Sequence, residues 1–244
     1  FIDNVKVSLN FVGVPEVCTD GIDNNGDGKA DCDDPTCASV YPCNATKLID
    51  EQFACSSTEW TYAGTDNAQN NKVIWANDNT PAVTPPTGTC SLNYNNGTNY
   101  DAKSGNGGSV ANAGTATYKK TVDTTGLSKV GITLKYYYDT ENGGQSGPYD
   151  LMYLQLSTDD FNGCCNVTTQ CSDPAPQNCN KNGTRSYLLP RSSVKAWLTF
   201  SQDLAAHFAN KAGIKVRFRF NTGDNQQNAF PGPRVDDVLM LGGK

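Results

Sequence analysis

Hydrophobic and polar residues alternate along much of this chain with a period of two, which is the pattern of β-strands with one buried face. The first residues show it clearly, because one face of residues 1–12 is hydrophobic and the other is polar. The hydrophobic face consists of Val5, Val7, Leu9 and Phe11. We therefore expect an N-terminal strand within residues 1–13.

The same alternation predicts a series of short strands in the rest of the chain. They are expected at 48–54, 58–63, 73–76, 91–94, 114–122, 129–139, 150–157, 196–201, 214–221 and 234–241. Clusters of Asn, Gly and Pro separate them, and one helical turn is expected at 203–211, where Leu204 and Phe208 lie four residues apart. Many short strands with almost no helical period favour an all-β fold, an antiparallel jelly-roll β-sandwich over residues 46–244.

The first strand has a near-copy at the other end of the chain. Residues 2–7 read Ile-Asp-Asn-Val-Lys-Val, and residues 235–240 read Val-Asp-Asp-Val-Leu-Met. A jelly roll needs one such closing strand, so the N-terminal copy has three interpretations. It is the end of a preceding repeat, a strand donated to the open sheet edge of a neighbouring subunit, or a strand paired with its own domain.

Length and charge narrow the class of protein. A chain of 244 residues can bury a substantial core. Charged residues make up 18% of the chain and its formal net charge is −6, so neither a nucleic-acid-binding surface nor a surface for anionic membranes is expected. Direct membrane insertion is not expected either, for lack of a sufficiently long apolar run. No apolar run of membrane-spanning length and no signal peptide is visible, so Phe1 is expected to be a processed or truncated start.

The cysteines indicate an oxidising compartment. The chain has 10 cysteines, no C-x-x-C pair and 1 histidine, which argues against zinc and for disulfides in a secreted or cell-surface protein. Cys55 and Cys90 follow strands that should be neighbours, and we expect them to bond. An insertion at 162–182 holds an adjacent pair that is expected to reach the two cysteines after it. The complete set is Cys18, Cys32, Cys37, Cys43, Cys55, Cys90, Cys164, Cys165, Cys171 and Cys179.

The acidic stretch at 23–34 has the spacing of a twelve-residue calcium-binding loop. It reads D-N-N-G-D-G-K-A-D-C-D-D, with Gly28 at the sixth position, where such a loop must turn sharply. No amphipathic helix flanks it, so a permanent structural Ca²⁺ is expected rather than a calcium sensor; the alternative is a solvated acidic turn. The candidate ligands are Asp23, Asn25, Asp27, the Lys29 carbonyl, Asp31 and Asp34.

Disulfides would reinforce this loop. We expect Cys18 to bond Cys32 and Cys37 to bond Cys43, although four cysteines allow three connectivities. Calcium and disulfides together would stiffen residues 14–45 into a linker that fixes the angle of the N-terminal strand, which a flexible tether would not do.

The run from residue 18 to residue 37 resembles the calcium loops of thrombospondin type 3 repeats and dockerins. Its sequence, Cys-Thr-Asp-Gly-Ile-Asp-Asn-Asn-Gly-Asp-Gly, looks like the C-x-D-G-I-D-N-D-G-D-G motif of secreted bacterial proteins. The last ligand position departs from an EF-hand, because Asp34 stands where that family has a bidentate Glu.

The remainder of the chain resembles bacterial extracellular jelly-roll modules, similar to the MAM and carbohydrate-binding-module superfamily. Short segments carry the resemblance, among them Leu-Ile-Asp-Glu-Gln-Phe at 48–53, Leu-Lys-Tyr-Tyr-Tyr at 134–138 and Val-Asp-Asp-Val at 235–238. Such modules serve adhesion, sugar binding and assembly alike. The resemblance implies a second calcium between the first and last strands, although the plainer role of these residues is edge-strand charge. The implied ligands are Asp50, Glu51, Asp236 and Asp237.

Aromatic residues and the lack of catalytic motifs bear on function. Side chains that could stack on sugar rings are Trp60, Trp75, Tyr94, Tyr100 and Tyr149, although most aromatic residues of a β-sandwich belong to its core. An enzyme is not expected, since glutamates are few and no H-E-x-x-H, G-x-S-x-G or P-loop motif occurs.

Two functions follow from these features. The leading hypothesis is an extracellular, calcium-stabilised structural subunit that assembles into a homo-oligomeric filament by strand donation. The alternative is a non-catalytic carbohydrate-binding or adhesion module of a larger secreted protein.

Deleting residues 1–12 tests the leading hypothesis. The truncated protein is expected to fold but to stay monomeric, because the strand that completes a neighbour's sheet is gone. Electron microscopy of the native and truncated proteins measures this; normal assembly of the truncated form would contradict strand donation.

Overall fold

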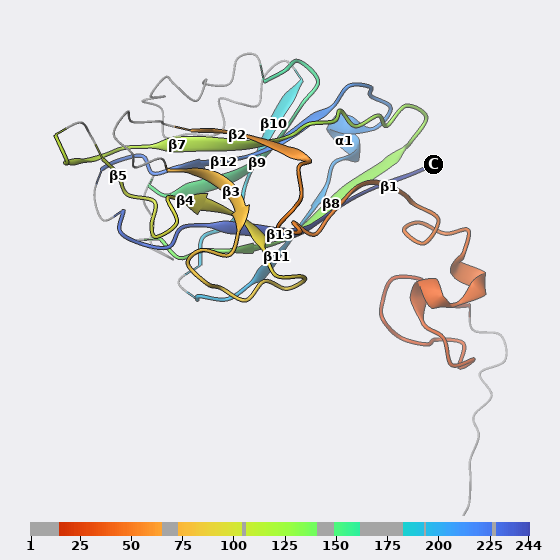
Figure 1. Cartoon of the computed structure of the whole chain (residues 1–244). Coiled ribbons are helices and arrows are strands. Elements are labelled where there is room, and N and C mark those ends of the chain that lie inside the picture. Colours follow the sequence, from red (N-terminus) through yellow and green to blue (C-terminus); the bar gives the residue numbers. More distant parts are fainter. Residues whose placement is uncertain are drawn as a thin grey trace, which may run out of the picture.

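The computed structural model describes residues 15–64, 73–103, 106–140, 149–161, 183–192, 194–225 and 228–244. Within these ranges the chain forms two antiparallel β-sheets that face each other, and a small segment projects from one side of them (Figure 1). The predicted N-terminal strand with Val5, Val7, Leu9 and Phe11 lies outside the described residues. So do Cys164, Cys165, Cys171 and Cys179.

Sheet A is organised around the last strand of the chain, β13 (Arg234–Gly243). β13 pairs along one side with β8 (Lys129–Tyr137), which in turn pairs with β11 (Leu198–Asp203). Two strands share its other side, because its first residues face β4 (Ser91–Asn95) and its later residues face β1 (Thr46–Glu51). β3 (Ile74–Asp78) pairs with β4 at the end of the sheet.

Sheet B contains five strands in the order β10-β9-β12-β7-β2. Their bounds are Thr184–Leu188 for β10, Leu151–Ser157 for β9, Lys215–Asn221 for β12, Ala113–Tyr118 for β7 and Trp60–Gly64 for β2. A short ladder of β5 (Ala102–Lys103) and β6 (Ser109–Val110) and one helical turn, α1 (Ala205–Phe208), complete the sandwich. None of the helices in the described ranges has the length or apolar character needed to cross a bilayer.

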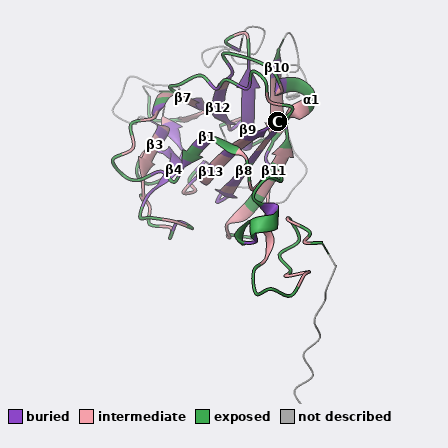
Figure 2. Ribbon diagram, turned by 90° about the vertical axis from the view of Figure 1, so that its right-hand side faces the viewer, coloured by how far each residue is buried: buried purple, intermediate pink, exposed green. Residues whose placement is uncertain are grey.

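Aromatic side chains fill the space between the two sheets. Tyr94 of sheet A and Phe220 of sheet B have ring centroids 5.2 Å apart, and Trp60 stacks on Phe218 at 5.5 Å. Figure 2 shows the buried positions concentrated on the strands of the sandwich. Inward and outward side chains alternate on β8, as the period of two predicted.

The predicted sugar platform is wrong for four of its five residues. Trp60 is 3% exposed, and Trp75, Tyr94 and Tyr100 are fully buried, so these side chains form the core and cannot stack on a ligand at the surface. The fifth residue, Tyr149, is 37% exposed. Alternation alone does not tell which face of a strand is buried, and that is why the aromatic residues were ambiguous.

Most predicted strands appear with small shifts at their ends, and the all-β prediction is confirmed. The helical turn at 205–208 is also confirmed, with Leu204 and Phe208 buried. β10, β5 and β6 were not predicted. The strand expected at 114–122 ends at Tyr118, after which Val122 makes only an isolated bridge to Ile214.

The cross-linked segment, residues 15–45, is held by two disulfides that differ from the expected pairs. Cys18 bonds Cys37 and Cys32 bonds Cys43, so the two closed loops overlap. The cause is local: the 3-10 helices Asp31–Asp33 and Pro35–Cys37 follow almost without a break, and the cysteine on each one bonds a different flanking stretch. The disulfide predicted between Cys55 and Cys90 is confirmed.

Candidate functional site

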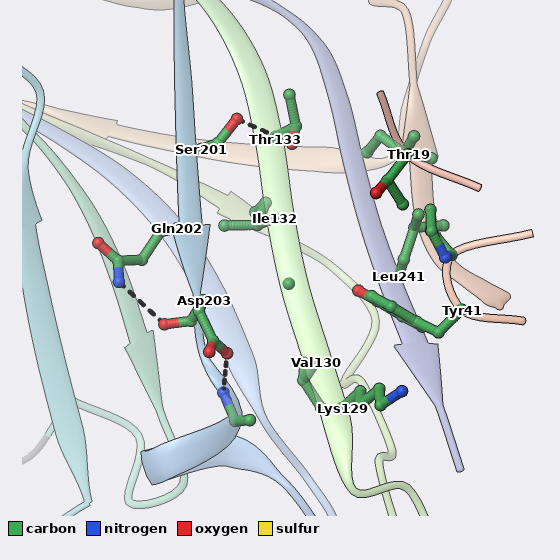
Figure 3. A pocket seen from close by; sticks show the side chains of 14 residues that line it. Thr19, Tyr41, Lys129, Val130, Ile132, Thr133, Ser201, Gln202, Asp203 and Leu241 are labelled. Atoms are coloured by element: carbon green, nitrogen blue, oxygen red, sulfur yellow. Dashed lines mark hydrogen bonds between the residues drawn. The ribbon is translucent and has the colours of Figure 1, made fainter. Parts of the chain in front are cut away.

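A pocket lies where the cross-linked segment meets the outward face of sheet A. Its volume is about 700 Å³, in the range of sites for small ligands. Figure 3 shows Thr19 and Tyr41 of the segment on one side and the strands β8 and β11 on the other. The pocket therefore exists only because the segment packs beside the sandwich.

Strand register builds the floor of the pocket. In β8 the residues Val130, Ile132 and Leu134 point into the core, which leaves Gly131 and Thr133 on the outward face. Cross-strand pairing then sets Ser201, Thr133 and Leu239 in one row and Asp203, Gly131 and Leu241 in the next. The floor is thus polar on the β11 side and apolar on the β13 side.

Tyr41 forms the wall of the pocket above two glycines. A Cβ atom on Gly243 would lie 2.5 Å from the Tyr41 Cδ2 atom, and one on Gly131 would lie 3.2 Å from its hydroxyl oxygen. The Lys129 Nζ atom lies 5.3 Å from the ring centroid of Tyr41. Burial and the negative charge of Asp203 raise the pKa of Tyr41, so its hydroxyl is a neutral donor at physiological pH.

The polar groups of the floor are partly committed to each other. The hydroxyl oxygens of Thr133 and Ser201 lie 3.1 Å apart. The Asp203 carboxylate accepts a hydrogen bond from the Ala205 backbone N–H at 2.9 Å. The Gln202 side-chain amide donates to the Asp203 carbonyl at 2.9 Å. Since Asp203 is the one carboxylate among the lining residues, the pocket lacks the carboxylate pair of a glycosidase.

In the predicted calcium loop, side-chain carboxylates accept hydrogen bonds from backbone N–H groups of the same segment. The Asp23 carboxylate accepts hydrogen bonds from the N–H groups of Gly26 at 2.6 Å and Gly28 at 2.7 Å. The Asp31 carboxylate accepts from Asp20 at 3.0 Å and Gly21 at 2.9 Å. Asp27 accepts from the Lys29 N–H at 2.9 Å, so each of these carboxylates already holds part of the loop.

Asp34 has a role that its position in the loop did not suggest. Its carboxylate caps the second 3-10 helix by accepting from the Thr36 N–H at 2.7 Å, and this bond is the main cause of its lowered pKa. It also accepts from the Asn25 amide at 2.6 Å. In the described ranges no group of three or more His, Cys, Asp or Glu side chains is arranged to hold a metal ion.

Each residue described next from the second predicted calcium set has its own hydrogen-bond or ion-pair partner. Asp50 pairs with Lys47 at 2.7 Å, and Glu51 accepts from the Phe53 N–H and the Ser57 hydroxyl. Asp237 accepts from the Thr87 hydroxyl at 2.5 Å.

Asp236 is the unusual member of this set. Its side chain is fully buried, and one carboxylate oxygen has no hydrogen-bond partner. Burial, together with the negative charges of Asp237 and Glu51, raises the pKa of Asp236 to about 7. An orphaned carboxylate oxygen beside two acids is a feature that a bound cation or a proton would relieve.

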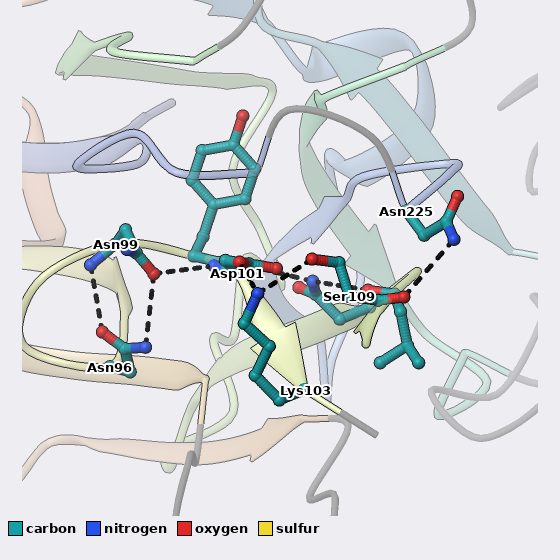
Figure 4. A network of polar contacts seen from close by, with 9 residues as sticks. Asn96, Asn99, Asp101, Lys103, Ser109 and Asn225 are labelled. Carbon is teal, nitrogen blue, oxygen red and sulfur yellow. Dashed lines mark hydrogen bonds and ion pairs between the residues drawn. The ribbon is translucent and has the colours of Figure 1, made fainter. Parts of the chain in front are cut away.

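A separate polar network ties the loops at one end of the sandwich (Figure 4). Lys103 forms an ion pair with Asp101 and donates to the Ser109 hydroxyl at 2.9 Å, while the Asn225 amide donates to the Ser109 carbonyl at 3.3 Å. These contacts fasten the β5–β6 ladder to the loop that carries Asn225.

Sequence reasoning missed the pocket residues Tyr41, Thr133, Ser201 and Asp203. One signal was available: Gly131 lies inside β8, near its start, and a glycine inside a strand often marks a close approach by another part of the chain. The identity of the approaching residue could not be read from the pattern.

Comparisons with known proteins give a likeness of fold only. No family model matches the sequence, and no curated protein matches it. The K1 cleaved adhesin domain of Lys-gingipain from Porphyromonas gingivalis W83 is similar, with 13% identity, a TM-score of 0.47, and 80% of this chain and 97% of that chain covered. TmCBM61, solved with β-1,4-galactotriose, has 12% identity and a TM-score of 0.44, covering 80% and 97%. The glycoside hydrolase domain of Endo-D from Streptococcus pneumoniae R6 has 12% identity and a TM-score of 0.39, covering 75% and 21%. With TM-scores below 0.5, these likenesses do not identify a function for this chain.

Replacing Asp236 by Asn is expected to change how stability depends on pH. A carboxyl whose pKa is raised on folding binds more protons in the folded state, so the wild-type free energy of unfolding should fall as pH rises from about 4 to about 7. The Asp236→Asn variant should lose that fall and be more stable than wild type at pH 7. Urea unfolding at several pH values in EDTA measures both effects.

The solvent-exposed Asp50→Asn variant is the control and should keep the wild-type slope. Repeating the series in Ca²⁺ tests the second calcium set, since a cation on Asp236 would make wild-type stability rise with pH instead. Equal slopes for wild type and Asp236→Asn in EDTA would show that burial of this carboxyl has no energetic consequence.

Proposed function

We propose that this chain is a non-catalytic saccharide-binding module of an extracellular protein, and that the ligand occupies the pocket between Tyr41 and the outward face of sheet A. The observation that carries the proposal is the composition of the pocket: an aromatic wall and apolar Leu239 and Leu241 on one side, and hydroxyl, amide and carboxylate groups on the other. Sugars have the matching character, with an apolar ring face and a rim of hydroxyl groups.

The proposal of a binding module rather than an enzyme rests on the single carboxylate in the pocket. Hydrolysis of a glycosidic bond requires an acid and a second carboxylate several ångström away. Asp203 has no such partner among the lining residues, and its carboxylate accepts from the Ala205 N–H.

An extracellular location is consistent with the disulfides. The described part of the chain holds three of them, and disulfides of this number are typical of secreted and cell-surface proteins. Filament assembly by strand donation stays a prediction, since the strand concerned lies outside the described residues.

We also retain calcium as a proposal for the loop at 23–34. The type and order of its oxygen donors support a cation, and folding the loop around backbone N–H groups keeps Asp23, Asp27 and Asp31 within one small turn. A cation there would stiffen the segment that carries Tyr41, which is how it would support the pocket.

Replacing Tyr41 by Ala is expected to weaken saccharide binding about tenfold or more, because the aromatic wall of the pocket is removed. A glycan array identifies a ligand, and calorimetric titration then compares the variants. Gly243→Val should also weaken binding, since its side chain would push the Tyr41 ring out of position.

Tyr149→Ala is the matched control, because Tyr149 is exposed but does not line the pocket. If this variant lost binding while Tyr41→Ala kept it, the ligand would bind elsewhere.

Removing calcium is expected to lower the melting temperature of the protein. A ligand at one hundred times its dissociation constant stabilises the folded state by about 3 kcal/mol, and EDTA would withdraw that amount. Asp23→Asn should reduce the response to EDTA, whereas Asp33→Asn, outside the proposed ligand set, should keep it. Differential scanning calorimetry measures the shift; identical melting with and without calcium would argue for a plain acidic turn.

A further inference from the structure

The outward face of β12 carries a row of cations in a chain that is acidic overall. Lys215, Arg217 and Arg219 alternate with the core residues Val216, Phe218 and Phe220. The whole chain has 25 acidic and 19 basic residues, so three positively charged residues at successive outward positions contrast with its net negative charge. These residues lie on sheet B, on the other side of the core from the pocket described above.

Strand register surrounds the two arginines with polar neighbours that carry no charge. Arg217 stands between Gln155 of β9 and Thr117 of β7, and Arg219 stands between Tyr153 and Thr115. The neighbours on β9 are themselves buried, with Gln155 fully buried and Tyr153 4% exposed. The face is therefore polar and shielded from water, an unusual combination for the outside of a sheet.

The position of Arg217 is fixed by two contacts. Its Nε–H donates to the Gln155 side-chain oxygen at 2.7 Å, and its guanidinium carbon lies 3.8 Å from the ring centroid of Phe161. Gln155 is in turn held by its amide, which donates to the Ser186 hydroxyl at 2.9 Å. Phe161 has a φ of 59°, a left-handed conformation that is rare for a bulky residue and that the surrounding structure must enforce.

Neither arginine has an ion-pair partner in the described part of the chain. The nearby carboxylate of Asp160 bonds the Lys215 Nζ atom at 2.5 Å instead. Arg219 is 8% exposed, and its buried Nε–H has no hydrogen-bond acceptor. Burial lowers the pKa of both groups, and the positive charge of Arg219 lowers that of Arg217 further, to about 10.

A third buried arginine, Arg234, provides a comparison, because carboxylates lie near its guanidinium. Arg234 is fully buried and its Nε–H also lacks an acceptor, but its guanidinium donates to the Pro81 carbonyl and the charges of Asp78 and Asp139 act on it favourably. Among the described residues no carboxylate pairs with Arg217 or Arg219, although the charge of Asp160 acts favourably on Arg217. Burying a charge without an ion-pair partner costs several kcal/mol. Hydrophobic residues would serve better at both positions if packing were their only role.

We propose that Arg217 and Arg219 form a binding site for an oxyanion group, a sulfate or a carboxylate. Guanidinium groups bind both groups through paired N–H donors, and low water content strengthens such bonds. The group can belong to a free ion or to an acidic polysaccharide, because the same donors recognise either.

Affinity electrophoresis of the full chain tests the site with dextran sulfate, polygalacturonate and neutral dextran as probes. Dextran sulfate or polygalacturonate should retard the wild type, and neutral dextran should not. Arg217→Gln and Arg219→Gln should each weaken the retardation about tenfold or more, as expected for loss of a charge-assisted hydrogen bond. Arg185→Gln on β10, two strands away from β12, removes the same charge and should have little effect, since the bond that Arg185 makes among the described residues goes to the neighbouring Thr184 carbonyl.

Thermal melting in sodium sulfate and in sodium chloride of equal ionic strength separates the two sources of the group. If sulfate raises the melting temperature more than chloride does, and Arg219→Gln abolishes that extra rise, the bound group is a free ion. If the polymers retard the protein but sulfate gives no extra rise, the group belongs to a polysaccharide. Without any anion, Arg219→Gln should melt no lower than wild type, since it removes a buried charge that has no ion-pair partner in the described part of the chain. The proposal would be overturned if Arg219→Gln and Arg219→Lys both melted at a lower temperature while their response to anions stayed unchanged. It would also be overturned if no anion affected the wild type, or if Arg185→Gln weakened the retardation as much as Arg217→Gln and Arg219→Gln.

Discussion

Backbone pairing of β13 is the constraint on which sheet A depends. This strand bonds β8 along one side and divides its other side between β4 and β1, so it joins the first, middle and last parts of the described sandwich. The same pairing sets the register of Leu239 and Leu241 beside Thr133 and Gly131, which is the floor of the pocket. Loss of this strand would remove the centre of the sheet and the apolar half of the proposed saccharide site together.

The sequence predicted the class of fold because alternation and turn residues are local signals, and both survive in a single sequence. It did not predict which sheet face is outward, since a period of two is the same from either side. Trp75 and Tyr94 therefore read as a sugar platform but lie in the core. The short strand β10 was missed because Thr-Arg-Ser-Tyr-Leu has no clear alternation of polar and apolar residues.

The candidate sites were harder to predict, because they depend on contacts between distant residues. Tyr41 meets Gly131 and Gly243 only once the chain has folded, and no spacing in the sequence connects them. The cationic row on β12 is different, since Lys215, Arg217 and Arg219 alternate visibly with Val216 and Phe218. The sequence could not show that Arg217 and Arg219 have no carboxylate partner among the described residues, because that depends on the folded structure.

The overlapping disulfides have a consequence for where the pocket can exist. Tyr41 lies between Cys37 and Cys43, and each of these cysteines is bonded to a different part of the cross-linked segment. Thiol reductants that opened both bonds would remove the covalent restraint that holds Tyr41 beside Gly131 and Gly243. Under the proposed function, ligand recognition would then depend on oxidising surroundings.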